Sequence, residues 1–144
     1  MLKTNESSRS IKRAQVSWQQ SEIDLKIAKS SLAKQPDKSS MQSAQAAMNA
    51  LSSILEAQGY FQLPAFSTVE LLKKCIEIEP SLEELRADCT LLDGTVERDS
   101  FGTTRTPHNH FTPAFAKACL KACDRIIKRT KKYWKQNKRQ YFNP

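Results

Sequence analysis

The sequence predicts an all-α protein, an antiparallel up-and-down bundle of four to five helices with a basic C-terminal helix extension. Apolar residues recur at spacings of three and four along most of the 144-residue chain, which is the period of an α-helix. The chain has only 3 glycines, too few for the many tight turns of an all-β fold. A chain of this length can also bury one continuous core without disulfides or metals. These observations favour a single helical domain.

The first two helices are predicted over residues 10–33 and 39–58. In the first, apolar or small residues alternate by four and three: Ala14, Trp18, Ser21, Leu25, Ala28 and Leu32. Pro36 separates the two helices because proline disfavours helical geometry in the residue before it. The second helix has the stripe Met41, Ala44, Met48, Leu51 and Leu55, widened by Ala46, Ala47 and Ala50. Gly59 follows it as an expected C-terminal cap.

Two short helices are predicted next, each opened by a capping box. Ser67–Glu70 is the first box, and it directs Val69, Leu72 and Ile76 inward until Pro80 ends the helix. Ser81–Glu84 is the second box. It opens a fourth helix whose inward stripe is Leu82, Leu85, Cys89 and Leu92. The helical pattern stops at Gly94, so we expect a long loop over residues 94–111.

The last helix is predicted to begin with Thr112 as N-cap and Pro113 at the first helical position. Its inward residues are Phe115, Cys119, Ala122 and Ile126. From residue 124 onward, eight basic residues stand against the single acid Asp124, so this segment holds +7 of the net charge of +8. We therefore predict three parts: a flexible N-terminus (1–9), the bundle (10–132) and a basic extension (133–144). The basic end would attract an anionic partner, or it could simply keep the protein soluble.

Several classes of protein are disfavoured. No segment approaches about 18 consecutive apolar residues, and residues 1–13 lack the apolar centre of a secretory signal. We therefore expect a cytoplasmic protein that does not enter membranes. Cysteines 75, 89, 119 and 123 fall on apolar stripes, which predicts free, buried thiols. Neither a phosphate-binding glycine loop nor a nucleophile elbow occurs, and we predict no cofactor.

The predicted loop contains the most specific group of polar residues in the chain: Arg105, His108, Asn109 and His110. An arginine can hold a phosphate by two hydrogen bonds, and a histidine can transfer protons near neutral pH. Together they suit cleavage of an RNA phosphodiester, with the arginine stabilising the charge of the transition state. The alternative is a structural loop in which Arg105 pairs with Asp99 or Glu97 and the histidines face water.

Zinc binding is a further interpretation of these histidines. His108, His110, Cys119 and Cys123 are of the types that bind zinc. Their spacing matches no familiar closed zinc site, and both cysteines lie on the core stripe of the last helix. We therefore predict no metal.

Several segments resemble HEPN domains, the higher eukaryotes and prokaryotes nucleotide-binding family. Trp18 with residues 21–28 resembles the family's first helix, and residues 44–51 are similar to its alanine-rich second helix. Thr104–Pro107 resembles the threonine-arginine-tyrosine-proline signature before the last helix, although Thr106 replaces the tyrosine. Residues 116–122 resemble the start of that helix. The resemblance covers roughly residues 11–130.

The resemblance implies a bundle that forms homodimers and that associates with nucleotidyltransferase or antitoxin partners. Catalytic branches cleave RNA without metal, using an arginine followed after four to six residues by a histidine, a spacing that Arg105 and His110 satisfy. It predicts a nucleotide- or RNA-binding protein, in which these residues are catalytic. The expected binding residues are Arg105, His108, Asn109, Lys128, Arg129 and Lys132. The alternative is a non-catalytic interaction module, with the alanine-rich second helix and Tyr60–Phe61 as its contact surface.

Overall fold

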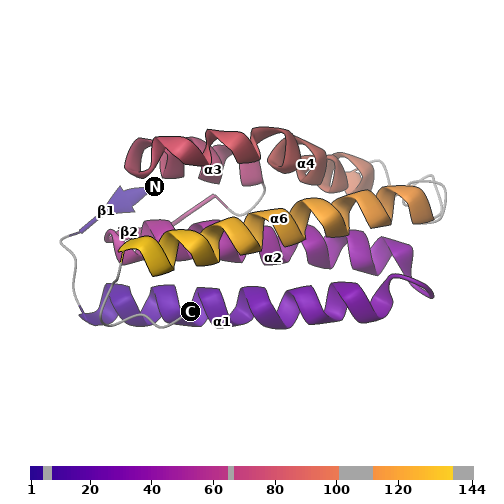
Figure 1. Cartoon of the computed structure of the whole chain (residues 1–144), viewed down its shortest axis with the longest axis horizontal. Helices are drawn as coiled ribbons and strands as arrows, with labels where there is room; N and C mark the ends of the chain where they lie inside the picture. Colours follow the sequence, from indigo (N-terminus) through magenta and orange to yellow (C-terminus); the bar gives the residue numbers. More distant parts are fainter. Residues whose placement is uncertain (5–7, 65–66, 101–111, 138–144) are drawn as a thin grey trace.

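The computed structural model describes residues 1–4, 8–64, 67–100 and 112–137, and it confirms an all-helical bundle (Figure 1). Its helices are α1 (Ser8–Ser31), α2 (Pro36–Ala57), α3 (Thr68–Ile78), α4 (Arg86–Ser100) and α6 (Pro113–Asn137). A 3₁₀ turn, η1 (Pro80–Leu85), joins α3 to α4. Strands β1 (Leu2–Lys3) and β2 (Tyr60–Phe61) pair antiparallel.

Helix α2 contacts α1, α3, α4 and α6, so it is the central helix. None of the helices in these ranges is long and apolar enough to cross a membrane.

Helices α1 and α2 form an antiparallel hairpin along the length of the molecule (Figure 1). Pro36 begins α2 rather than separating two helices at a distance, because the first helical position needs no backbone N–H donor. Ser39 Oγ donates to the Ala28 carbonyl at 2.7 Å and closes the turn. Gly59 ends the hairpin as predicted, with a φ of 95° that glycine adopts without strain. Met41 was predicted to face inward, but it is 44% exposed.

The alanine-rich face of α2 lies inside the bundle. Ala44, Ala46, Ala47 and Ala50 are all buried against neighbouring helices. Their small side chains allow close approach of α1 and α6, which are among the helices that contact α2. The predicted partner contact on this face is therefore wrong, because it is already used to hold the fold together.

The α3–η1–α4 segment is held at its start by Asp93. The Asp93 carboxylate accepts hydrogen bonds from the Thr68 backbone N–H and hydroxyl, both at 2.7 Å, and from Ser67 Oγ at 2.8 Å. This acceptor from α4 thus satisfies donors at the N-terminus of α3. Ser81 was expected to cap a helix, but its hydroxyl donates to the Glu79 carboxylate instead. Residues 80–85 form a 3₁₀ turn before α4 begins, and no side-chain cap is described for that turn.

Helix α4 continues through Gly94 to Ser100, so the expected loop start at residue 94 is wrong. Buried Leu92 and Thr95 flank the glycine, and the Thr95 hydroxyl donates to the Leu92 carbonyl at 2.8 Å. A Cβ at Gly94 would lie 3.7 Å from the Phe115 ring, an ordinary van der Waals distance, so α4 packs against α6 here without requiring glycine. The helix continues through this position despite the low helix propensity of glycine.

Helix α6 belongs to the bundle over its whole described length. Tyr133 and Trp134 are buried, and Trp134 Nε1 donates to Ser53 Oγ of α2 at 3.3 Å. The predicted boundary between bundle and extension at residues 132–133 is therefore wrong. Residues 138–144 of the predicted extension lie outside the described ranges. The predicted flexible N-terminus also differs, because Leu2–Lys3 pairs with Tyr60–Phe61 and α1 begins at Ser8.

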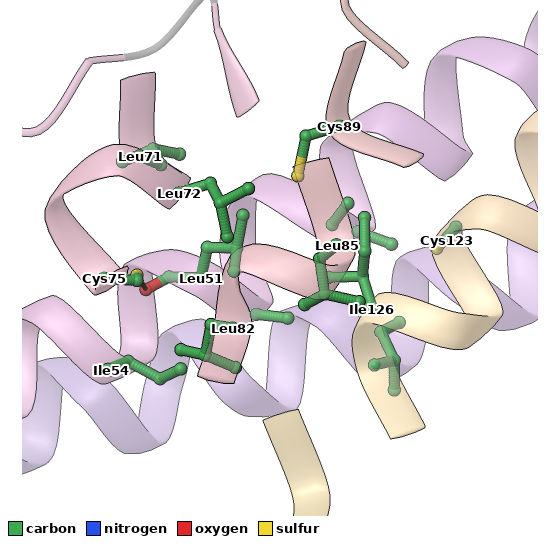
Figure 2. Close-up of a cluster of buried hydrophobic side chains, with 14 of the residues drawn as sticks. Leu51, Ile54, Leu71, Leu72, Cys75, Leu82, Leu85, Cys89, Cys123 and Ile126 are labelled. Atoms are coloured by element: carbon green, nitrogen blue, oxygen red, sulfur yellow. Dashed lines mark hydrogen bonds between the residues drawn. The ribbon is translucent and has the colours of Figure 1, made fainter. Parts of the chain in front are cut away.

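All five described helices and η1 contribute to the core, and Figure 2 shows the part of it that holds Leu51, Leu72, Leu82 and Ile126. The four cysteines are free and buried, as predicted. Burial raises the pKa of the Cys89 and Cys123 thiols to about 12. Both remain protonated at neutral pH, so they act as small apolar side chains rather than nucleophiles.

Candidate nucleic-acid interface

The outer surface of α6 carries a row of lysines, which we call the lysine face. Its members are exposed: Lys117, Lys121, Lys128, Lys131, Lys132 and Lys135. At about 100° per residue these positions fall within an arc of about 100°, opposite the buried side of the helix. From Lys117 to Lys135 the row extends about 27 Å, at about 1.5 Å per residue. The lysine face is therefore a straight cationic strip that spans most of α6.

The orientation of α6 is set by its first turn and by its buried side. Thr112 Oγ1 accepts a hydrogen bond from the Phe115 N–H at 3.1 Å, which confirms the predicted N-cap. Cys119, Ile126 and Trp134 are buried on the opposite side from the lysines. The bundle therefore holds the lysine face outward along its whole length.

Most lysines of this face are not engaged with neighbouring acids. Lys128 Nζ pairs with Asp124 one turn earlier, at 2.7 Å. Among the side chains of residues 1–4, 8–64, 67–95 and 112–137, the other five lysines have no ion-pair partner. Their ammonium groups are hydrated and can exchange water and counterions for phosphate oxygens without breaking a contact of the fold.

The two arginines beside the lysine face have a different role. Arg125 makes a two-point contact with Asp88 of α4, with Nη2 at 2.6 Å from Oδ1 and Nε at 3.1 Å from Oδ2. The hydrogen bonds that Arg125 donates to Asp88 raise the pKa of Arg125 above its usual value. Arg129 Nε donates to Glu84 Oε1 at 2.9 Å, and only 12% of its side chain is exposed. These arginines hold α6 against η1 and α4.

The predicted binding residues therefore divide into three groups. Lys132 is exposed and unpaired among the described residues, and Lys128 is exposed but paired with Asp124. Arg129 is committed to Glu84, so its availability to a ligand is low. The remaining predicted residues, Arg105, His108, Asn109 and His110, lie outside the described residues. The zinc alternative shared these histidines, and the described part of the chain holds no group of three His, Cys, Asp or Glu side chains around a common point.

Sequence reasoning missed the beginning of the lysine face. The basic segment was taken to begin at Asp124. Lys117 and Lys121 come before that residue, so they were not part of the predicted site. The signal was nevertheless present, because Lys117, Lys121, Lys128 and Lys132 are separated by four, seven and four residues. That spacing places side chains on one face of a helix.

Comparisons with known proteins add no assignment to this site. No protein-family model matches the chain, and neither a curated protein nor a solved structure matches it.

Proposed function

We propose that this chain is an RNA- or nucleotide-binding helical bundle of the HEPN-like type, and that it binds the phosphate backbone along the lysine face of α6. The observation that carries the proposal is the row of exposed lysines over about 27 Å of helix, at about 1.5 Å per residue. A row this long can contact several phosphates of one strand at once, which a single surface lysine cannot. Backbone contacts of this kind supply affinity without reading sequence.

Single-stranded RNA is the substrate class to test first. Fluorescence anisotropy with a labelled oligonucleotide is expected to show binding at 0.1 M salt that weakens steeply toward 1 M salt. Affinity that does not change with salt would contradict the proposal, because neutral contacts would then supply the binding.

The catalytic form of the proposal adds cleavage of the bound RNA without metal. Arg105 and His110 directly precede the capped start of α6 in the sequence. Arg105 would stabilise the charge of the transition state, and His110 would transfer protons. Wild type and His110→Ala are incubated with single-stranded RNA in chelator. Cleavage by wild type alone supports the catalytic form, and intact RNA in both samples refutes it.

A second candidate is self-association, and it is favoured by apolar side chains on the outer face of α1. Val16 is 64% exposed and Ile23 is 50% exposed, and their spacing of seven places them on one face two turns apart. A second copy of this chain could cover both by pairing α1 with α1. Light scattering after size exclusion is expected to give a dimer that Val16→Ser/Ile23→Ser converts to a monomer. A wild-type monomer at high concentration would argue against this candidate. A complex of this chain with a nucleotidyltransferase or an antitoxin, formed when the two proteins are mixed, would favour that partner instead.

A further inference from the structure

A second polar site lies on α1, α2 and the segment that follows β2. It is a pocket of about 340 Å³. Its lining includes Arg13 and Ser17 of α1, Glu56 of α2, and Phe61 of β2. No residue of the lysine face lines it, so the proposed RNA-binding surface does not account for it. Its volume is in the range of pockets that hold small organic ligands, about 300–1,000 Å³.

The carboxyl group of Glu56 is the chemical centre of this pocket. Ser17 Oγ donates a short hydrogen bond to Glu56 Oε1. The second oxygen, Oε2, accepts no hydrogen bond from the described residues. Burial raises the pKa of Glu56, while the Ser17 hydrogen bond and the charge of Arg13 lower it. The pocket therefore contains a partly buried carboxylate whose second oxygen is open to solvent and to N–H donors of a ligand.

The charge of the pocket points to a neutral ligand. Arg13 and Glu56 are the two charged residues that line it, and their charges cancel at neutral pH. A cationic ligand would be attracted by Glu56 but repelled by Arg13, and an anionic ligand the reverse, so neither charge gains a clear advantage. A neutral ligand with N–H donors can satisfy the carboxylate without adding an unpaired charge to a half-buried site.

An aromatic residue in the lining favours a flat ligand. Phe61 lines the pocket, and its backbone pairs with Leu2 of β1. The next residue, Gln62, has a φ of 54°, which is uncommon for a residue with a side chain. Strained backbone of this kind clusters at ligand sites. An aromatic residue and a carboxylate in the lining of one pocket suit a planar heterocycle that stacks while its edge is hydrogen-bonded.

We propose that this pocket binds a neutral 2-amino-4-oxo heterocycle, the chemistry shared by guanine and pterins. The ring N–H and the adjacent amino group would both donate to Glu56, and the ring would stack on Phe61. This inference goes beyond the proposed RNA binding and does not depend on it, because the heterocycle needs no phosphate.

The test is isothermal titration of the full-length protein with guanosine, pterin, inosine and adenosine at pH 7.5. Guanosine, pterin or both should bind, which also distinguishes the two sources of this chemistry. Inosine lacks the amino group of guanosine, and it should bind about tenfold more weakly or worse. Guanosine affinity should change less than about twofold between 0.1 and 1 M salt, whereas binding to the lysine face is lost over that range. A failure of RNA binding is therefore distinguishable from a failure of this proposal.

Variants locate the ligand. Glu56→Gln should weaken binding at least about tenfold, since it removes a charged acceptor. Phe61→Leu should weaken it about tenfold by loss of stacking. Glu22→Gln, at an exposed position of α1 outside the pocket, makes the same charge change and should have no effect. Absence of saturable binding to wild type, equal affinity for guanosine and inosine, or unchanged binding to a folded Glu56→Gln variant would each overturn the proposal.

Discussion

Removing three lysines from α6 should show whether the lysine face binds RNA or only keeps the protein soluble. The variant is Lys121→Gln/Lys132→Gln/Lys135→Gln. All three side chains are exposed and have no ion-pair partner among the side chains of residues 1–4, 8–64, 67–95 and 112–137, so the change breaks no ion pair there. Glutamine has nearly the helix propensity of lysine, so α6 should remain intact. Lys128 is left in place because it pairs with Asp124.

The expected magnitude follows from counterion release. Each lysine that contacts a phosphate of a single strand contributes about 0.7 to the slope of log affinity against log salt. Three lysines therefore contribute about 2.1 to the slope, so at 0.1 M salt the variant should bind RNA about 100-fold more weakly than wild type. This loss corresponds to about 2.9 kcal/mol of binding free energy. Near 1 M salt the two proteins should bind about equally.

The assay is fluorescence anisotropy of one labelled single-stranded RNA at several salt concentrations. The matched control is Lys12→Gln/Lys26→Gln/Lys38→Gln, which removes the same charge from exposed positions of α1 and α2. If the lysine face is the site, the slope of log affinity against log salt for the control should differ from the wild-type slope by no more than the contribution of one contact, about 0.7. Equal loss of affinity in both variants would refute the reasoning, because net charge rather than the arrangement on α6 would then control binding.

Three further predictions concern stability. Asp93→Ala should lower the free energy of unfolding by about 3 kcal/mol in urea denaturation, since it leaves the Thr68 donors without their charged acceptor; a loss below about 0.5 kcal/mol would show that water replaces the carboxylate. Trp134→Ala should cost about 3–5 kcal/mol because the ring is buried and bonded to Ser53, whereas an extension outside the bundle would tolerate the change. The raised pKa of Glu56 means that the folded state binds more protons than the unfolded state just above pH 4.5. Wild type should therefore lose stability relative to Glu56→Gln as pH rises through that window, by at most about 1.4 kcal/mol per pH unit, and a constant or opposite difference in thermal denaturation would contradict this.

Local signals in the sequence were sufficient for most helix boundaries. Thr112 before Pro113 predicted the start of α6, and Gly59 predicted the end of the α1–α2 hairpin, because caps depend on neighbouring residues. The end of α4 depends on packing instead. Gly94 reads as a helix stop in isolation, but it lies against Phe115 of α6, a contact that no local pattern contains.

The candidate site could be predicted only in part, for a similar reason. Counting charge located the excess of lysine and arginine in α6, but a count does not separate free cations from paired ones. Arg125 and Arg129 were counted with the lysines, yet their partners Asp88 and Glu84 lie 37 and 45 residues earlier in the chain. The Glu56 pocket was missed altogether. Its walls come from α1, α2 and the segment after β2, and their meeting is a property of the fold.

Mapping RNA contacts by NMR tests the lysine face most directly. The ¹⁵N-labelled full-length protein is titrated with a short single-stranded RNA at 0.1 M salt, and amide shift changes are followed residue by residue. The largest changes should follow the exposed side of α6 from Lys117 to Lys135, and they should disappear at 1 M salt. Saturable shifts confined to α1 or α3, with α6 unaffected, would contradict the proposal that this helix binds the RNA backbone.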